Sequence, residues 1–287
     1  MSQLSPSAAP AGPAALLPKL EEGTAIPRLI HQTFMTKNLP PEMQANVDKL
    51  QAMNPGWVHQ LYDDHDIEAF IRENYGPGVL GYYQRINPRY GAARADLFRY
   101  LLLYKRGGVY LDIKSTCTQP LDQLLQPGER YVLAHWRNQP GDPHEGFGIQ
   151  EKEVAHIAGG EFQQWHIVAA PGHPFLRAVI EAVLRNIDNY RPWLHGTGGI
   201  GVLRLTGPLV YTLAIHPLLA TAPHRLVANE TAMGLQYSVY GKGLHRAAYK
   251  TNYSALTESV VHLKPAHQLP AYLYSMVKKG RNLLRGR

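Results

Sequence analysis

Cysteine is almost absent from this chain, which has Cys117 alone among its 287 residues. One cysteine excludes an intramolecular disulfide and a cysteine-based zinc site, and it is typical of a reducing compartment. Charged residues are also scarce, at 18% against roughly 25% in an average globular chain. The apolar fraction is an ordinary 45%, and 17 Tyr and 4 Trp exclude disorder throughout.

Long hydrophobic runs are missing as well. No stretch approaches the roughly 18–20 apolar residues of a membrane span, and no repeat period is found, which excludes solenoids and coiled coils. The first 24 residues are rich in Ala, Pro and Ser, and they lack the basic start and apolar centre of a signal peptide. We therefore expect a flexible segment over residues 1–24 and a cytoplasmic protein.

Acidic residues are outnumbered, with 22 Asp and Glu against 29 Lys and Arg, a formal charge of +7. The basic residues are scattered, except for Lys278, Lys279, Arg281, Arg285 and Arg287 at the C-terminus. No zinc finger, homeodomain-like helix or RNP-type strand accompanies them, so a nucleic-acid partner is not expected. The charge indicates another anionic partner: a nucleotide, a lipid diphosphate or, by peripheral contact, the inner face of an anionic membrane.

Strand and helix patterns alternate along the chain. Strands are expected at 26–34, 57–62, 109–113, 130–135, 167–170 and 260–263, and helices at 40–53, after Asp63 or Asp64, at 92–106, at 174–189 and after 206–208. A flexible loop is expected at 196–201. This order predicts an α/β protein with a parallel sheet. No linker separates two domains, so we expect one domain over residues 25–265 and a basic tail over residues 266–287.

The most informative stretch is residues 91–116. A strong helix ends at two glycines, and a short apolar strand follows at once and carries Asp112 at its end. Open α/β sheets bind ligands at this edge, where a carboxylate can hold a cation or a ribose hydroxyl. Asp96 and Arg99 share one face of the preceding helix. An ordinary turn aspartate and a surface ion pair remain the alternative interpretation.

Residues 94–100 and 107–112 together resemble the signature of the DXD-motif sugar-binding glycosyltransferases. This family includes the fungal initiating α-1,6-mannosyltransferase and many bacterial capsule and lipopolysaccharide glycosyltransferases, with the clostridial glucosylating toxins as distant relatives. Further similar segments occur in the family's order at 26–32, 54–64, 164–175 and 206–208. One D-x-D would be a weak signal, whereas several ordered segments are specific.

The resemblance implies a GT-A fold, a single Rossmann-like domain with a mixed, mostly parallel sheet, and a nucleotide-sugar donor bound together with Mn²⁺ or Mg²⁺. It implies transfer of a hexose with retention, in the synthesis of a surface polysaccharide or lipopolysaccharide. The residues that it implies are catalytic Asp96, Arg99 and Asp112, donor-binding His31, Gln32, Thr33, Arg94, Asp96, Arg99, Tyr110 and Lys114, and metal-binding Asp112 and His262.

One departure from the family pattern concerns the metal. The motif here is D-I-K, and Lys114 cannot bind a cation as the usual last carboxylate does. Either Asp112 and another ligand such as His262 hold the ion, or Lys114 itself offsets the diphosphate charge. His262 has an equally plain interpretation as a strand-end histidine. The leading hypothesis is a glycosyltransferase acting on a glycan or lipid-linked acceptor, and the alternative is a catalytically silent nucleotide-sugar or glycan-binding protein.

Overall fold

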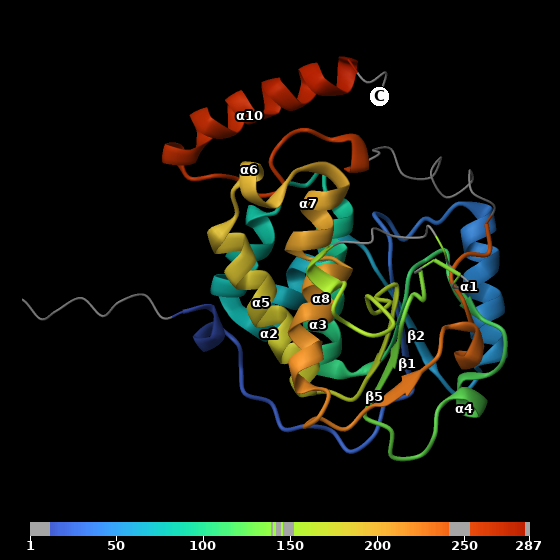
Figure 1. The fold of residues 1–287 in the computed structure, drawn as a ribbon. Helices are drawn as coiled ribbons and strands as arrows, with labels where there is room; N and C mark the ends of the chain where they lie inside the picture. Colours follow the sequence, from blue (N-terminus) through green and yellow to red (C-terminus); the bar gives the residue numbers. More distant parts are fainter. Residues whose placement is uncertain (1–11, 139, 142–144, 146–151, 241–252, 285–287) are drawn as a thin grey trace, which may run out of the picture.

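A computed structural model describes residues 12–138, 140–141, 145, 152–240 and 253–284. A six-stranded sheet in the order β2-β1-β3-β6-β5-β7 forms its centre (Figure 1). The strands are β1 Leu29–Thr33, β2 Val58–Tyr62, β3 Gly108–Leu111, β5 Tyr131–Ala134, β6 His166–Ala169 and β7 Arg225–Val227, and β4 Thr116–Cys117 pairs separately with β8 Leu235–Gln236. Within the large sheet only β6 runs antiparallel to its neighbours. The mixed, mostly parallel α/β sheet expected from the sequence is confirmed.

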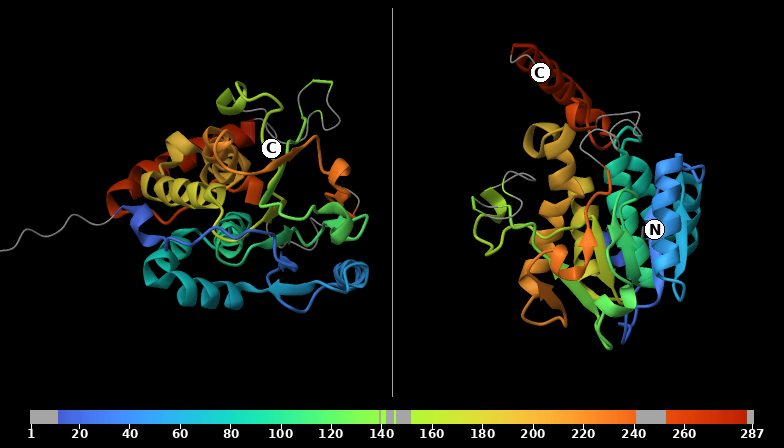
Figure 2. Two further views of the ribbon diagram at one scale, coloured as in Figure 1. Left: turned by 90° about the horizontal axis from the view of Figure 1, so that it is seen from below. Right: turned by 90° about the vertical axis from the view of Figure 1, so that its right-hand side faces the viewer.

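Helices cover both faces of this sheet, as Figures 1 and 2 show. The helices are α1 Pro41–Met53, α2 Asp64–Arg85, α3 Gly91–Arg106, α4 Leu121–Leu124, α5 Pro174–Asn189, α6 Pro192–His195, α7 Gly198–Leu205, α8 Pro208–Ile215 and α10 Pro265–Leu284. Residues of α2, α3, α5, α7 and α8 form the larger core on one face. Residues of α1 and α4 join a second core on the other face.

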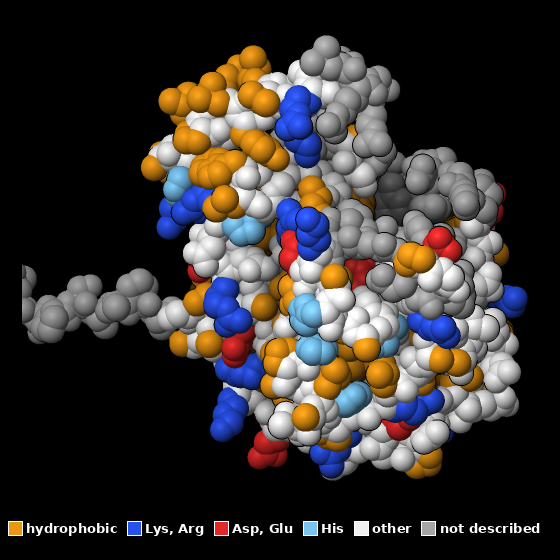
Figure 3. Space-filling model, viewed as in Figure 1, with side chains coloured by type: hydrophobic (Ala, Val, Ile, Leu, Met, Phe, Trp, Pro, Cys, Tyr) orange, Lys and Arg blue, Asp and Glu red, His pale blue; other side chains and the backbone are white. Residues whose placement is uncertain are grey.

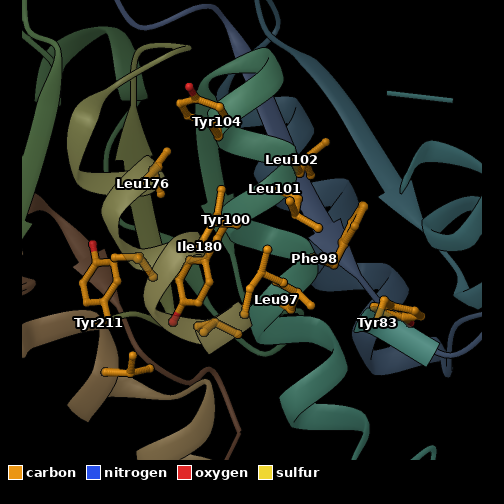
Figure 4. Packing of buried hydrophobic residues seen from close by; sticks show 14 of the residues in the cluster. Tyr83, Leu97, Phe98, Tyr100, Leu101, Leu102, Tyr104, Leu176, Ile180 and Tyr211 are labelled. Atoms are coloured by element: carbon orange, nitrogen blue, oxygen red, sulfur yellow. The ribbon is translucent and has the colours of Figure 1, made fainter. Parts of the chain in front are cut away.

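Alternating side chains of β3 separate these two cores. Val109 and Leu111 pack with Leu50 of α1, whereas Tyr110 between them packs with the cluster around α3. Successive side chains of a strand point to opposite faces, so a short apolar strand supplies both cores. Figure 4 shows the α3 side, where Leu97, Tyr100 and Leu101 lie among side chains of neighbouring helices. The strand that precedes Asp112 is therefore held rigidly from both sides.

The connection between α3 and β3 requires glycine. Gly107 and Gly108 have φ values of 65° and 104°, in the region that side chains rarely adopt. A Cβ atom on Gly107 would lie 2.6 Å from Pro171 Cδ, and one on Gly108 would lie 2.7 Å from the Leu29 carbonyl oxygen. The glycines therefore end the helix, as the sequence indicated, and also allow close approach of two neighbouring segments.

Three sequence-based expectations differ from the structure. A flexible segment was expected over residues 1–24, but residues 12–24 are packed against the domain. Leu17 is buried in the larger core, and Gly23 N donates to the Pro171 carbonyl. Residues 1–11 lie outside the described part. The expected loop at 196–201 is largely helical in α7, where Gly198 and Gly201 allow close packing. The expected strand at 260–263 is only a bridge between Val261 and Ile86.

One helical stretch, Gly198–Leu218, is long and apolar enough to cross a membrane by length and composition. It comprises α7, α8 and the 3₁₀ turn His216–Leu218, and 67% of its apolar window is buried inside the fold. Such burial is typical of a core helix, and Leu205 and Val210 of this stretch belong to the larger core.

Replacing Gly108 by alanine tests the packing at the α3–β3 connection. We expect Gly108→Ala to lower the free energy of unfolding by about 2 kcal/mol, because it combines a strained φ with a steric clash. Urea unfolding measures the change. The control is Gly81→Ala, at a helical position where a Cβ meets nothing within 4 Å. Equal stability of the two variants would contradict the role given to Gly108.

Candidate active site

The candidate site lies where β1 and β3 end. These strands are parallel, so their carboxyl ends meet at one edge of the sheet. Asp112 follows β3 directly, and its backbone N–H donates to the Trp165 carbonyl at 2.9 Å. Gln32, near the end of β1, donates from Nε2 to the Asp112 carbonyl at 3.3 Å. The backbone around Asp112 is thus fixed by both neighbouring strands.

A row of alternating charges begins inside the protein at Asp96. Its carboxylate accepts from Thr206 Oγ1 at 2.8 Å and from Gln164 Nε2 at 3.2 Å. Arg99 Nη2 lies 3.1 Å from Asp96 Oδ1, and Arg99 Nη1 lies 3.2 Å from Asp112 Oδ1. One guanidinium therefore joins the two carboxylates that the sequence singled out, and the pair on α3 does point toward Asp112.

Lys114 completes the row. Its Nζ lies 3.7 Å from Asp112 Oδ2, and it donates to Tyr237 Oη at 2.7 Å. Nζ also lies 4.0 Å from the centre of the Tyr237 ring, a cation–π contact. The side chain of Lys114 is 13% exposed and that of Asp112 is 24% exposed, whereas those of Asp96 and Arg99 are almost fully buried. The Asp112–Lys114 end of the row is thus the end that solvent reaches.

Tyrosine side chains surround the row and support its charges. The Arg99 guanidinium lies 4.6 Å from the centre of the Tyr110 ring, and Tyr110 Oη bonds with Thr33 Oγ1 at 3.0 Å. Burial raises the pKa of Tyr110 above its usual range. Burial, with the nearby Asp96, Tyr237 and Asp112, raises the pKa of Tyr253 to about 12. These hydroxyls therefore stay protonated at neutral pH.

Burial also affects the charges themselves. It raises the pKa of Asp96 to about 6, against the opposing effects of Arg99 and the Thr206 hydrogen bond. Burial lowers the pKa of Arg99, but Tyr110, Asp112 and Asp96 together raise it above its usual value. At neutral pH Asp96 is therefore ionised and paired with a charged Arg99.

Other residues of the predicted set lie apart from this row. Arg94 donates from Nε to the Ile86 carbonyl and lies over the Tyr83 ring. At about 100° per residue, Arg94 lies on the opposite side of α3 from Asp96 and Arg99. The geometry therefore gives no support to Arg94 as a donor-binding residue.

His31 and His262 also lie away from the row. His31 is fully buried, with Nε2 paired to the Gly107 carbonyl and Nδ1 to Tyr62 Oη, so it does not face a ligand. His262 is exposed, and among the described residues no hydrogen bond, ion pair or metal-ligand group joins it to Asp112. The reason is that residues 260–263 bridge to Ile86, at the end of α2, instead of entering the sheet.

Sequence reasoning gave no role to Gln164 or Tyr237. Gln164 binds Asp96 with its side-chain amide, and its carbonyl accepts from Arg99 Nη1 at 2.8 Å. It precedes β6, whose antiparallel direction brings its start to the edge where β3 ends. Knowing that direction would have identified Gln164, whereas no local signal identified Tyr237. Trp165 Nε1, which is buried next to Tyr237, has no hydrogen-bond partner among the described residues.

The residues around Asp112 do not fit a divalent cation. Among the described residues, Asp112 is the one carboxylate at the solvent-reached end, and both of its oxygens face a cation, Arg99 on one side and Lys114 on the other. Among the residues described, Asp63, His65 and Asp66 have ligand atoms close enough for a metal. However, Asp63 caps α2 with a capping box and Asp66 pairs with Lys37 at 2.8 Å, which accounts for that group without a metal.

Comparison with known proteins finds similarity to glycosyltransferases. The family model "Glycosyltransferase sugar-binding region containing DXD motif" matches residues 31–131. The chain is 31% identical over 193 residues to inositol phosphoceramide mannosyltransferase 3 of Schizosaccharomyces pombe, covering 67% of this chain and 45% of that protein. It is 26% identical over 211 residues to the initiation-specific alpha-1,6-mannosyltransferase of Candida albicans, covering 67% and 53%. The chain thus spans about half the length of these relatives.

Among solved structures, the PaToxG glycosyltransferase aligns with a TM-score of 0.48 and 16% identity, over 88% of this chain and 86% of that one. The match to the DXD-motif glycosyltransferase family model covers residues 31–131. This confirms the resemblance stated from the sequence. The matched region contains the whole charged row, from Asp96 to Lys114.

The buried His31 gives a test of the packing beneath the site. Burial lowers the pKa of His31 to about 4, below the usual 6.5. The folded protein therefore keeps His31 neutral, and its contribution to stability is complete above pH 6.5 and is lost as the pH falls toward 4. Between pH 7 and pH 5, we expect the free energy of unfolding of the parent to fall by about 1–2 kcal/mol more than that of His31→Gln.

Urea unfolding at both pH values measures this difference. The control is His65→Gln, which replaces an exposed histidine at the start of α2. If the parent and His31→Gln had the same pH dependence, His31 would not be the buried neutral group described.

Proposed function

We propose that this protein is a glycosyltransferase that moves a hexose from a nucleotide diphosphate sugar to a glycan or lipid-linked acceptor. The observation that carries the proposal is the row Asp96–Arg99–Asp112–Lys114, which is fixed at the carboxyl end of the sheet and is reached by solvent at its Asp112–Lys114 end. The family match over residues 31–131 supports a sugar-binding role for the same region. The mannosyltransferase names of the relatives favour mannose as the hexose.

The electrostatics of the row suit glycosyl transfer. Transfer leaves negative charge on the departing diphosphate and positive charge at the anomeric carbon, and preorganised charges stabilise such a state best in a water-poor site. In our proposal the Lys114 ammonium meets the diphosphate and Asp112 lies toward the sugar. Arg99 and Asp96 hold Asp112 in position from inside. No metal enters this scheme, because the residues around Asp112 do not fit one.

Further details of the reaction are part of the same proposal. Retention at the anomeric carbon, a role in surface polysaccharide or lipopolysaccharide synthesis, and a cytoplasmic location follow from the resemblance and the sequence. One relative is named for inositol phosphoceramide and another for an alpha-1,6 linkage. These names support an acceptor that is either a lipid-linked or a glycan hydroxyl.

A catalytically silent binding protein is the second candidate function. The presence of Lys114 in place of the motif's last carboxylate favours it. Thermal stabilisation by UDP-, GDP- and dTDP-sugars would be common to both functions, because any ligand of the folded state raises the melting temperature. Turnover of the stabilising donor, measured as released nucleotide, separates an enzyme from a binding protein.

Asp112 is the first residue to test for catalysis. We expect Asp112→Asn to lower the transfer rate by a factor on the order of 10²–10³, since it removes a positioned charge from the reacting region. Released nucleotide diphosphate measures the rate, and the melting temperature checks the fold. The control is Asp48→Asn, an exposed carboxylate on α1. Near-parental turnover by Asp112→Asn would remove Asp112 from the mechanism.

Lys114 is the residue that decides the metal requirement. Lys114→Asp removes the cation next to Asp112 and supplies a second carboxylate, a ligand type that Mn²⁺ and Mg²⁺ accept. We expect the activity of the parent to depend little on added Mn²⁺ and that of Lys114→Asp to depend on it strongly. Activity is titrated with Mn²⁺ for both proteins and for Lys49→Asp, an exposed lysine on α1. Superimposable curves for all three would contradict the role given to Lys114.

A further inference from the structure

The C-terminal helix α10 has its apolar side facing outward. Five apolar side chains between 55% and 68% exposed follow the helical spacing i, i+3, i+4, i+7 and i+8: Leu269, Tyr272, Leu273, Met276 and Val277. This spacing places them on one face, which we call the outer stripe. In Figure 3 hydrophobic atoms gather over α10 at the top of the molecule. A surface helix of a soluble domain normally turns such a face toward the core.

The opposite side of α10 faces the domain, and it is largely polar or small. Its members are His267, Ala271, Tyr274, Ser275 and Lys278. Lys278 Nζ donates to the Thr197 carbonyl at 2.9 Å and to Thr197 Oγ1 at 2.7 Å. Ala271 is the buried member, with 8% of its surface exposed. These contacts fix the rotation of α10 about its axis, so the outward direction of the stripe is a property of the fold.

Two more apolar side chains come from α6, beside α10 in Figure 1. Trp193 is 39% exposed and Leu194 is 66% exposed. The Trp193 ring lies 6.3 Å from the ring of His267, which joins α6 to α10. Exposed apolar side chains therefore occur on two neighbouring elements that are far apart in the sequence. Exposed apolar patches mark interaction sites on proteins.

The charged residues of the sequence spans that contain α10 and α6 have a single sign. Exposed Lys279 and Arg281 fall on either side of the stripe at about 100° per residue. The chain has no Asp or Glu from residue 259 to its end, and none from residue 189 to 229, which includes α6. Lys278, which the sequence grouped with the basic tail, is instead turned inward. Arg285 and Arg287 lie outside the described residues.

We propose that the outer stripe, with Trp193 and Leu194, is a docking surface for an anionic lipid membrane. Apolar side chains would enter the boundary between headgroups and acyl chains, with Lys279 and Arg281 against anionic headgroups, as in interfacial amphipathic helices. The one-sided charge favours an anionic surface over a second copy of the chain, since two copies would bring like charges together. The inference stands on this surface alone and does not depend on transfer activity.

Flotation of the full-length protein with vesicles tests the proposal. The vesicles contain phosphatidylglycerol and phosphatidylcholine in equal parts, with pure phosphatidylcholine for comparison. We expect the parent to float with the anionic vesicles. Leu273→Ser/Val277→Ser should reduce the bound fraction by about tenfold, because insertion depends on the apolar face. Lys279→Glu/Arg281→Glu should remove the preference for anionic vesicles.

The matched control is Val58→Ser/Leu226→Ser, which changes exposed apolar residues on the two edge strands. It should float like the parent. Equal recovery of Leu273→Ser/Val277→Ser and the parent would overturn the proposal. The proposal would also be overturned if the parent formed a dimer and bound no vesicles, while Leu273→Ser/Val277→Ser was a monomer. The outer stripe would then be a contact between two copies of the chain. Donor turnover without vesicles is measured in parallel, so that loss of docking and loss of activity are distinguished.

Discussion

The structure of the site depends on one buried guanidinium. Arg99 contacts Asp96 and Asp112, lies over the ring of Tyr110, and donates to the carbonyl of Gln164. A buried charge is tolerated only when it is paired and its donors are satisfied, and truncating one partner leaves the other uncompensated. The helix α3, the end of β3 and the start of β6 are thus fixed to one another through a single side chain.

Local patterns were sufficient to predict much of this arrangement. Helical periodicity placed Asp96 and Arg99 on one face, and the short strand after two glycines placed Asp112 at the sheet edge. The same periodicity places Arg94 on the opposite side of α3, although the family resemblance had included it. The elements that were missed depend on long-range packing. Gly198 and Gly201 allow close packing inside a helix, and residues 260–263 bridge to a helix end instead of joining the sheet.

Contacts between distant parts of the sequence explain what the sequence could not provide. Lys114 meets Tyr237, which lies 123 residues away, and Asp96 meets Thr206, which lies 110 residues away. The substitution of lysine in the motif was visible in the sequence, but its consequence was not. Only the geometry shows that the ammonium lies against Asp112, so that the four charges of the row cancel. In the proposed site the positive charge therefore comes from the Lys114 side chain, at the position where the family pattern has a carboxylate.

The two-glycine connection between α3 and β3 also makes the number of residues between it and Asp112 important. Three strand residues, Val109, Tyr110 and Leu111, separate it from Asp112, and their side chains alternate between the two cores. An insertion of one residue there would exchange the faces of the strand. The Tyr110 ring, which contacts the Arg99 guanidinium, would then point toward α1, and an aliphatic side chain would take its place. Such an insertion would disrupt the arrangement of the charged row without replacing any charged residue. The spacing between the glycines and Asp112 is therefore itself part of the motif.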